Sequence, residues 1–175
     1  MNLQSLIRTI PNHPIQGVQF RDVTTLMLDP EGLRSSIDGL AARHVDAPVD
    51  LVAGIESRGF IFGTAVAYRL GLGFVPFRKP GKLPGETLGR DFELEYGTDR
   101  LEVHVGAITA GQRVILVDDL IATGGTAEAA VLLMREMGAE VISCDFVVSL
   151  PDLGGADRLR DLGCEVHALC EFAGD

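Results

Sequence analysis

The chain alternates short apolar runs with segments in which apolar residues recur every three or four positions. The runs predict buried β-strands, and the segments predict amphipathic α-helices. Asp29 followed by Pro30 is typical of a helix N-terminus. The predicted strands are 50–55, 73–77, 113–117, 141–150 and 165–169, and the predicted helices are 29–44, 59–70, 125–137 and 156–162. This order predicts an α/β fold around a mostly parallel sheet flanked by helices.

One region departs from this alternation. Residues 79–91 hold two prolines and three glycines, a composition that predicts a mobile loop. Two short alternating runs follow at 92–96 and 101–105, with Gly97 and Thr98 between them, and they predict an antiparallel hairpin. The sequence therefore predicts a flexible lid between the second and third strands of the sheet.

Bulk composition narrows the class of protein. The length of 175 residues fits a single domain spanning 1–175, and a hydrophobic content of 46% is enough for a sizeable core. The formal net charge of −10 argues against a general binder of nucleic acid or anionic membrane. An anionic ligand would therefore need a local cluster of donors.

The N-terminal residues, the apolar runs and the cysteines indicate the cellular compartment. The first ten residues lack the pattern of a signal peptide, and no apolar run is long enough to span a membrane. The three cysteines, Cys144, Cys164 and Cys170, form no C-x-x-C pair, which argues against structural zinc or a disulfide framework. These features predict a cytoplasmic protein.

The most informative segment is 114–126, with the sequence VILVDDLIATGGT. An apolar strand is followed by Asp118 and Asp119 and then by a small-residue turn that opens a helix, whose free N–H groups can bind a phosphate. The two carboxylates would repel a phosphate but can accept hydrogen bonds from sugar hydroxyls. A ribose 5-phosphate meets both demands. The predicted contacts are Asp118, Asp119, Ala122, Thr123, Gly124, Gly125 and Thr126.

The same loop has other interpretations. Asp119 and Thr123 could instead only shape a turn and cap the helix. A P-loop requires Gly-Lys followed by Ser or Thr, whereas Gly81-Lys82 is followed by Leu83. A G-x-G-x-x-G dinucleotide fingerprint is also missing from the sequence. Nucleoside triphosphate and NAD sites are therefore disfavoured.

A second turn suited to anions follows the strand 50–55. Its sequence is Glu-Ser-Arg-Gly at 56–59, it opens a helix, and Arg58 can donate paired hydrogen bonds to a pyrophosphate. The alternative is a capped helix start with a solvated arginine. Basic residues near the mobile loop add positive charge in an acidic chain. The predicted pyrophosphate contacts are Glu56, Ser57, Arg58, Arg78, Lys79 and Lys82.

Residues 114–126 resemble the 5-phosphoribosyl-1-pyrophosphate (PRPP) motif of the type I phosphoribosyltransferases. Residues 17–22, 54–60, 77–84 and 93–97 resemble the adenine-specific branch of that family, in the family's order. The resemblance implies the type I fold with a small N-terminal hood. It also implies a homodimer and purine salvage, in which adenine and PRPP give AMP and pyrophosphate. The enzyme would be a glycosyltransferase of the pentosyltransferase class.

The same resemblance implies roles for individual residues. Glu95 and Tyr96 match the family's proposed catalytic pair, with Arg58 beside them, although Glu95 alone reads as an exposed strand residue. Mg²⁺ is implied, held by substrate oxygens and water rather than by protein ligands. The hood would hold the base. The implied adenine contacts are Gln19, Phe20, Arg21 and Leu150.

Three alternatives stay open on the sequence alone. Enzymes for 6-oxopurines usually place a lysine after the phosphate loop, and residues 147–150 offer none, which favours a 6-amino base. A purine-sensing regulator usually carries an added DNA-binding domain, for which an acidic chain of 175 residues leaves little room. A purely structural role ranks last. Departures from the family's usual pattern bear on base recognition and occur at Gln16, Thr25, Ser149 and Asp152.

Overall fold

The structure is a computed structural model that describes residues 2–94 and 97–174. Glu95 and Tyr96, the catalytic pair implied by the resemblance, lie outside the described residues. None of the helices in the described part of the chain has the length and apolar character needed to cross a membrane.

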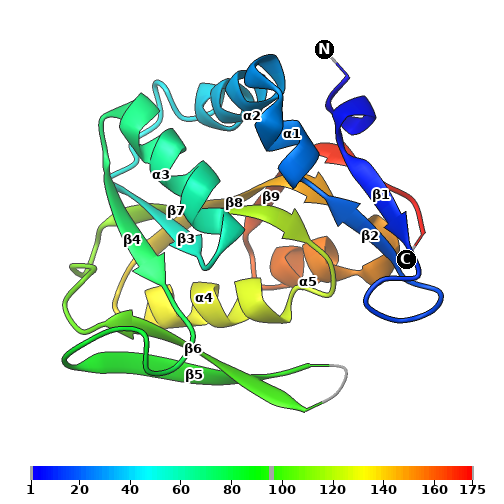
Figure 1. Ribbon diagram of the computed structural model, residues 1–175. Helices are drawn as coiled ribbons and strands as arrows, with labels where there is room; N and C mark the ends of the chain where they lie inside the picture. Colours follow the sequence, from blue (N-terminus) through cyan, green and yellow to red (C-terminus); the bar gives the residue numbers. More distant parts are fainter. Residues whose placement is uncertain (1, 95–96, 175) are drawn as a thin grey trace.

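A five-stranded parallel sheet forms the centre of the molecule, with the strand order β4-β3-β7-β8-β9 (Figure 1). Its strands are β3 (Leu51–Ile55), β4 (Gly73–Phe77), β7 (Arg113–Ile121), β8 (Glu140–Ser149) and β9 (Glu165–Glu171). All four pairings between neighbours are parallel. The predicted α/β class and the five predicted strands are confirmed.

Helices cover both faces of this sheet, as Figure 1 shows. They are α2 (Pro30–Ala42) and α3 (Arg58–Leu70) on one face, and α4 (Gly125–Glu136) and α5 (Gly155–Asp161) on the other. Each face has its own apolar core, with Phe62 of α3 in one and Met134 of α4 in the other. The predicted cap of α2 is also confirmed, because Asp29 Oδ1 accepts a hydrogen bond from the Gly32 N–H at 2.7 Å.

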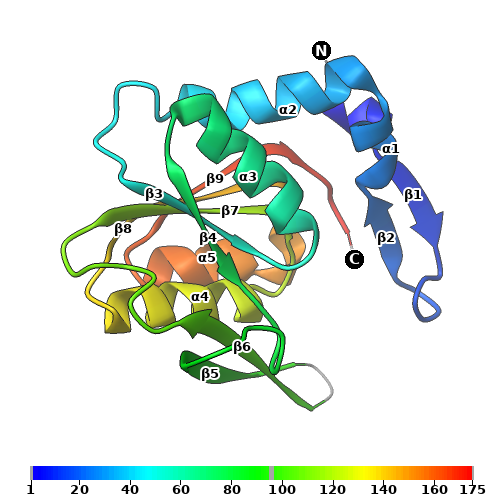
Figure 2. The same cartoon turned by 60° about the vertical axis from the view of Figure 1, so that its left-hand side comes forward.

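Two antiparallel units stand apart from the central sheet (Figure 2). The N-terminal unit contains η1 (Leu3–Leu6), β1 (Arg8–Pro11), β2 (Gln19–Asp22) and α1 (Thr24–Leu28). The second unit pairs β5 (Thr87–Glu93) with β6 (Thr98–His104). One short helix, η2 (Pro151–Leu153), precedes α5. The N-terminal unit corresponds to the hood that the resemblance implies, although its strands were not predicted individually.

The predicted antiparallel hairpin is confirmed, but its strands are β5 (Thr87–Glu93) and β6 (Thr98–His104) rather than 92–96 and 101–105, so Thr98 belongs to a strand and not to the turn. Two neighbouring boundaries also differ from the prediction. The strand predicted at 113–117 continues to Ile121, because Asp118, Leu120 and Ile121 still pair with β8. The loop predicted at 79–91 ends earlier, because β5 begins at Thr87 and pairs with His104. Backbone pairing does not require apolar side chains. Hydrophobic patterning therefore ended β7 at the two aspartates that interrupt its apolar run, and it missed the polar start of β5.

A polar network is buried between α2 and β8. Asp145 Oδ2 accepts a hydrogen bond from the Ser143 hydroxyl at 2.7 Å and lies 2.8 Å from Nε2 of His44. All three residues are buried. The network therefore holds the turn after α2 against β8. Removing one partner would leave the others buried without a hydrogen bond and would lower the stability of the fold.

Candidate active site

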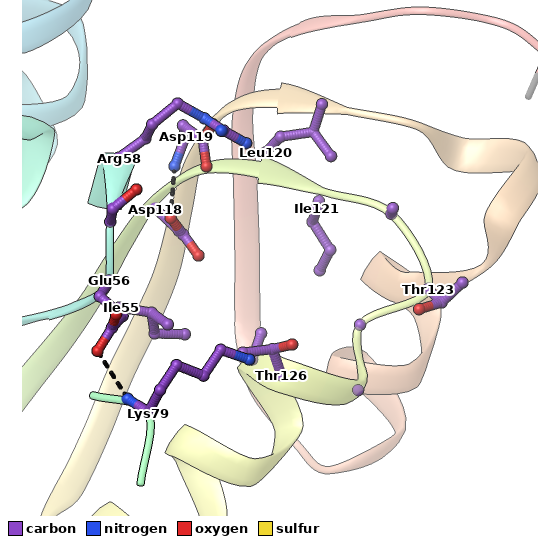
Figure 3. Close-up of a pocket in the computed structure, with 15 residues that line it drawn as sticks. Ile55, Glu56, Arg58, Lys79, Asp118, Asp119, Leu120, Ile121, Thr123 and Thr126 are labelled. Atoms are coloured by element: carbon purple, nitrogen blue, oxygen red, sulfur yellow. Dashed lines mark hydrogen bonds and ion pairs between the residues drawn. The ribbon is translucent and has the colours of Figure 1, made fainter. Parts of the chain in front are cut away.

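The candidate site lies where the strand order of the sheet reverses. From β3 the chain moves outward to β4, whereas from β7 it moves outward in the opposite direction to β8 and β9. Ligands of open α/β sheets bind at such a switch point, beyond the carboxyl ends of the strands. A cavity of about 350 Å³ lies there, between the turn after β3 and the turn after β7 (Figure 3).

The cavity brings together most of the predicted contacts for ribose 5-phosphate and pyrophosphate. Ile55, Leu120, Ile121 and Ala127 also line it and were not predicted, since their apolar character gave no functional signal. The predicted residues that line it are Glu56, Ser57, Arg58, Lys79, Asp118, Asp119, Ala122, Thr123, Gly124, Gly125 and Thr126.

The turn after β7 depends on a glycine at residue 124. Gly124 has φ of +83°, in the left-handed region, and a Cβ there would lie 2.8 Å from Cα of Gly155. The Gly155 N–H donates to the carbonyl of Ala122 at 3.0 Å, which fixes this turn against the first residue of α5. The turn leads into the first N–H groups of α4, an arrangement that suits a phosphate.

The two aspartates at the end of β7 have different surroundings. Asp118 Oδ1 accepts a hydrogen bond from the Asp119 N–H at 2.9 Å, whereas the Asp119 carboxylate pairs with the guanidinium of Arg58. Burial raises the pKa of Asp118 well above its ordinary value, and the neighbouring charge of Asp119 adds to this effect. Burial acts to lower the pKa of Arg58, but the hydrogen bond and charge of Asp119 outweigh it, so that pKa is raised.

Glu56 faces the start of the predicted loop. Its Oε1 accepts a hydrogen bond from the Lys79 N–H at 2.7 Å and another from Nε of Arg78 at 3.2 Å (Figure 3). This carboxylate therefore ties the turn after β3 to the end of β4. Arg58 reaches from the same turn across to Asp119, so an ion pair joins the turn after β3 to the end of β7.

The remaining predicted residues lie elsewhere, outside the cavity lining in the part of the chain that the structure describes. Arg78 packs 5.9 Å from the ring centre of Phe60, and Lys82 is exposed. In the hood, the Phe20 ring meets His13 edge-on. Gln19 is half-buried on the same strand, β2.

The last two predicted base contacts also take part in packing. The Arg21 guanidinium lies 4.5 Å from the ring centre of Phe172 and donates to Thr9. Leu150 is buried, and its N–H donates to the carbonyl of Ile121 at 3.0 Å. Leu150 therefore lies beside the end of β7, where the pairing of β7 with β8 ends.

Replacing Asp118 by Asn is expected to raise the free energy of unfolding at pH 7. The pKa of Asp118 is higher in the folded protein than its value of 3.8 in the unfolded chain, so the carboxyl ionises more readily when the protein unfolds. The free energy of unfolding of the wild type therefore falls as the pH rises from 3.8 toward the pKa of the folded state. The amide of the variant cannot ionise, so the gain should appear at pH 7 and vanish below pH 3.8. Urea unfolding of wild type and variant at pH 7 and at a pH below 3.8 measures this difference in stability. A variant less stable than wild type at pH 7 would contradict the expectation.

Comparison with known proteins agrees with this geometry. The family model for the phosphoribosyl transferase domain matches residues 28–167. The adenine phosphoribosyltransferase of Nitrosospira multiformis is 62% identical over 175 residues and covers 100% of both chains. This chain belongs to the adenine phosphoribosyltransferase family.

Solved structures of adenine phosphoribosyltransferases share the fold. The enzyme from Rhodothermus marinus superposes with a TM-score of 0.91 at 46% identity, over 97% of this chain and 96% of that one. The enzyme from Saccharomyces cerevisiae, crystallised with adenine and an imino-altritol bisphosphate, gives a TM-score of 0.88 at 40% identity, over 95% and 96% of the two chains. The type I phosphoribosyltransferase fold predicted from the sequence is therefore confirmed.

The side chains of the cavity indicate how it could hold Mg²⁺, the metal that the family resemblance implies. Within residues 2–94 and 97–174, no three His, Cys, Asp or Glu side chains are grouped to hold a metal ion. The cavity does contain the carboxylates of Asp118, Asp119 and Glu56. Mg²⁺ usually keeps several waters and binds through one or two carboxylates plus substrate phosphates, so this cavity fits a magnesium ion that enters with the substrate.

Proposed function

We propose that this chain transfers the phosphoribosyl group of PRPP to adenine, giving AMP and pyrophosphate. The observation that carries the proposal is one cavity lined by two turns that open helices and by a pair of carboxylates. Relatives named adenine phosphoribosyltransferase over the full length support the choice of base.

In this proposal the ribose 5-phosphate occupies the β7 side of the cavity. The turn 122–126 receives the 5-phosphate through its N–H groups and through the hydroxyls of Thr123 and Thr126. Asp118 and Asp119 accept hydrogen bonds from the ribose hydroxyls. Because Arg58 pairs with Asp119 in the structure, sugar binding would release this guanidinium toward the pyrophosphate.

The pyrophosphate would lie on the β3 side, against Ser57, Arg58 and Lys79. Arg78 and Lys82 would join it from the loop. Mg²⁺, when bound, would neutralise charge on the departing pyrophosphate. The bond between C1 of the ribose and its pyrophosphate oxygen breaks, and a ring nitrogen of adenine attacks the sugar from the opposite face. As this bond breaks, negative charge builds up on the pyrophosphate, and positively charged side chains beside it stabilise that charge.

The base would bind between the hood and the end of β8, where Gln19, Phe20, Arg21 and Leu150 were predicted to contact it. Residues 147–150 offer no lysine for a 6-oxo group, which supports adenine over hypoxanthine or guanine. Loop 79–86 would shield the reactive sugar from water.

Glu95 is proposed to manage the proton of the adenine ring, with Tyr96 beside it. Replacing Glu95 by Gln is expected to lower kcat far more than it weakens adenine binding, because an amide fills the same volume but cannot take up a proton at neutral pH. Steady-state kinetics together with calorimetric adenine binding separate the two effects. An unchanged kcat would exclude the proton-transfer role.

Three further features belong to the same proposal. We expect residues 1–175 to act as one phosphoribosyltransferase domain, since the central sheet is shared by both apolar cores. We expect a homodimer, by analogy with the family. We expect a cytoplasmic location, which the three free cysteines support.

The deciding experiment is product analysis. The protein is incubated with PRPP, Mg²⁺ and each purine base in turn, and nucleotide and pyrophosphate are assayed. AMP formed from adenine, with no nucleotide from hypoxanthine, guanine or xanthine, is the expected result. Nucleotide from a 6-oxopurine would reassign the base, and PRPP binding without any product would favour a purine-sensing regulator.

A further inference from the structure

Lys79 is fixed at its backbone and along its side chain. Its N–H donates to Glu56 Oε1 at 2.7 Å, its ammonium group pairs with the carboxylate of Asp99, and its Nζ lies 5.4 Å from the ring centre of Phe92. The side chain extends across the cavity, toward the side on which Thr126 opens α4 (Figure 3). Lysine is usually a flexible point charge, so this degree of anchoring is unusual.

The hairpin supplies both side-chain partners of Lys79. Phe92 on β5 and Asp99 on β6 are directly opposite in the register, so their side chains lie on the same face of the hairpin. Asp99 is itself oriented, because its Oδ1 accepts a hydrogen bond from the Arg100 N–H at 2.7 Å while its Oδ2 faces Lys79. The hydrogen bond from Lys79 lowers the pKa of Asp99, so the carboxylate is ionised at neutral pH.

Asp99 does not line the cavity in the described part of the chain, whereas Lys79 does. The carboxylate is 27% exposed, in a position where an ion pair is partly shielded from water. An ammonium group that is already held in place loses less side-chain entropy when an anion arrives than a free lysine does. The effect of Asp99 on an anionic ligand would therefore pass through Lys79.

We propose that Asp99 is a positioning residue that holds the Lys79 ammonium group inside the cavity, where it meets the anionic groups of PRPP. This inference rests on the proposed function. Asp99 touches no reacting atom in this scheme. It acts by restricting one cation, and in doing so it connects the cavity with the hairpin.

The first test is Asp99→Asn, which keeps the shape of the side chain and removes its charge. The expected result is a KM for PRPP raised roughly five- to tenfold, with the KM for adenine unchanged. Asp99→Glu keeps the charge and should recover part of the loss. A purely structural role would not separate the two substrates, so equal rises in both KM values would overturn the proposal, as would no rise at all.

The second test is a double-mutant cycle. Because Asp99 is expected to act through Lys79, adding Asp99→Asn to Lys79→Ala should leave the KM for PRPP at the value of Lys79→Ala alone. A further rise of similar size in that background would overturn the proposal. Asp91→Asn is the matched control, since Asp91 lies on the same hairpin, is 71% exposed and pairs with Arg100 at 2.9 Å. This control should leave both KM values unchanged.

Calorimetric titration of the protein with PRPP tests the role of Asp99 independently of whether the protein makes AMP. If wild type makes no AMP but binds PRPP, the proposed reaction fails, and the positioning role is still decided by the Kd of Asp99→Asn. A Kd roughly five- to tenfold weaker than that of wild type supports the role. An unchanged Kd overturns it.

Discussion

Replacing Gly59 by Ala is expected to lower kcat/KM for PRPP by about 10²-fold or more, because small displacements of positioned groups have effects of this size. A Cβ at this residue would lie 2.5 Å from Oδ1 and 3.1 Å from Cγ of Asp118, and 3.3 Å from the carbonyl oxygen of Val117. Two of these atoms belong to a carboxylate already engaged with the Asp119 N–H. Either that carboxylate or the first turn of α3 must move.

Both outcomes disturb the same cavity. Moving Asp118 displaces a proposed ribose contact, and moving α3 displaces the turn that carries Ser57 and Arg58. Gly39→Ala is the matched control, because Gly39 also lies in a helix and its Cβ would approach only the flexible end of Leu169, at 3.1 Å. The control should keep its activity. An active Gly59→Ala enzyme with normal PRPP kinetics would contradict the expectation.

Replacing Asp145 by Ala is expected to lower the free energy of unfolding by about 3 kcal/mol, or roughly 6–12 °C in Tm. The change leaves His44 and Ser143 buried without their common acceptor. The loss should lie at the lower end of the range for buried pairs. The reason is that Asp145 Oδ1 is itself buried with no hydrogen-bond partner among the described residues, and its removal recovers part of the cost.

Thermal and urea unfolding measure this loss, and two variants calibrate it. Asp145→Asn keeps one acceptor oxygen and should lose less. Asp157→Ala removes an acid that pairs with Arg160 at 2.7 Å but is 75% exposed, so it should change stability by less than about 1 kcal/mol. A Tm for Asp145→Ala within about 2 °C of wild type would show that the network contributes little.

Hydrophobic patterning was enough to predict the central sheet because its three inner strands, β3, β7 and β8, consist largely of buried residues. In β7, Val114 to Val117 are all buried, and such runs stand out in a sequence. The cavity could be predicted for a related reason. Both of its turns directly follow apolar strands that are neighbours in the sheet, so locating the strands located the turns.

Contacts between distant and polar residues could not be predicted in this way. The Lys79–Asp99 pair depends on the register of the hairpin, and β5 begins among polar residues that read as loop. His44 and Asp145 are 101 positions apart, and neither stands in a motif. Specific pairs of this kind produce no periodic pattern in the sequence, because the identity of one partner does not indicate where the other lies in the chain.

The hood has a consequence for how this fold can change. Its two strands form a sheet of their own, joined to the rest through α1 and through side-chain contacts such as that of Arg21 with Phe172. The cavity proposed to bind PRPP is instead built from the loops of the central sheet. Because the proposed base site includes the hood as well as the end of β8, part of the nucleobase preference could diverge by mutation within a short N-terminal module, while the cavity proposed to bind PRPP is inherited intact. Swapping residues 7–23 between relatives with different bases would be the natural starting point for engineering a new nucleotide product.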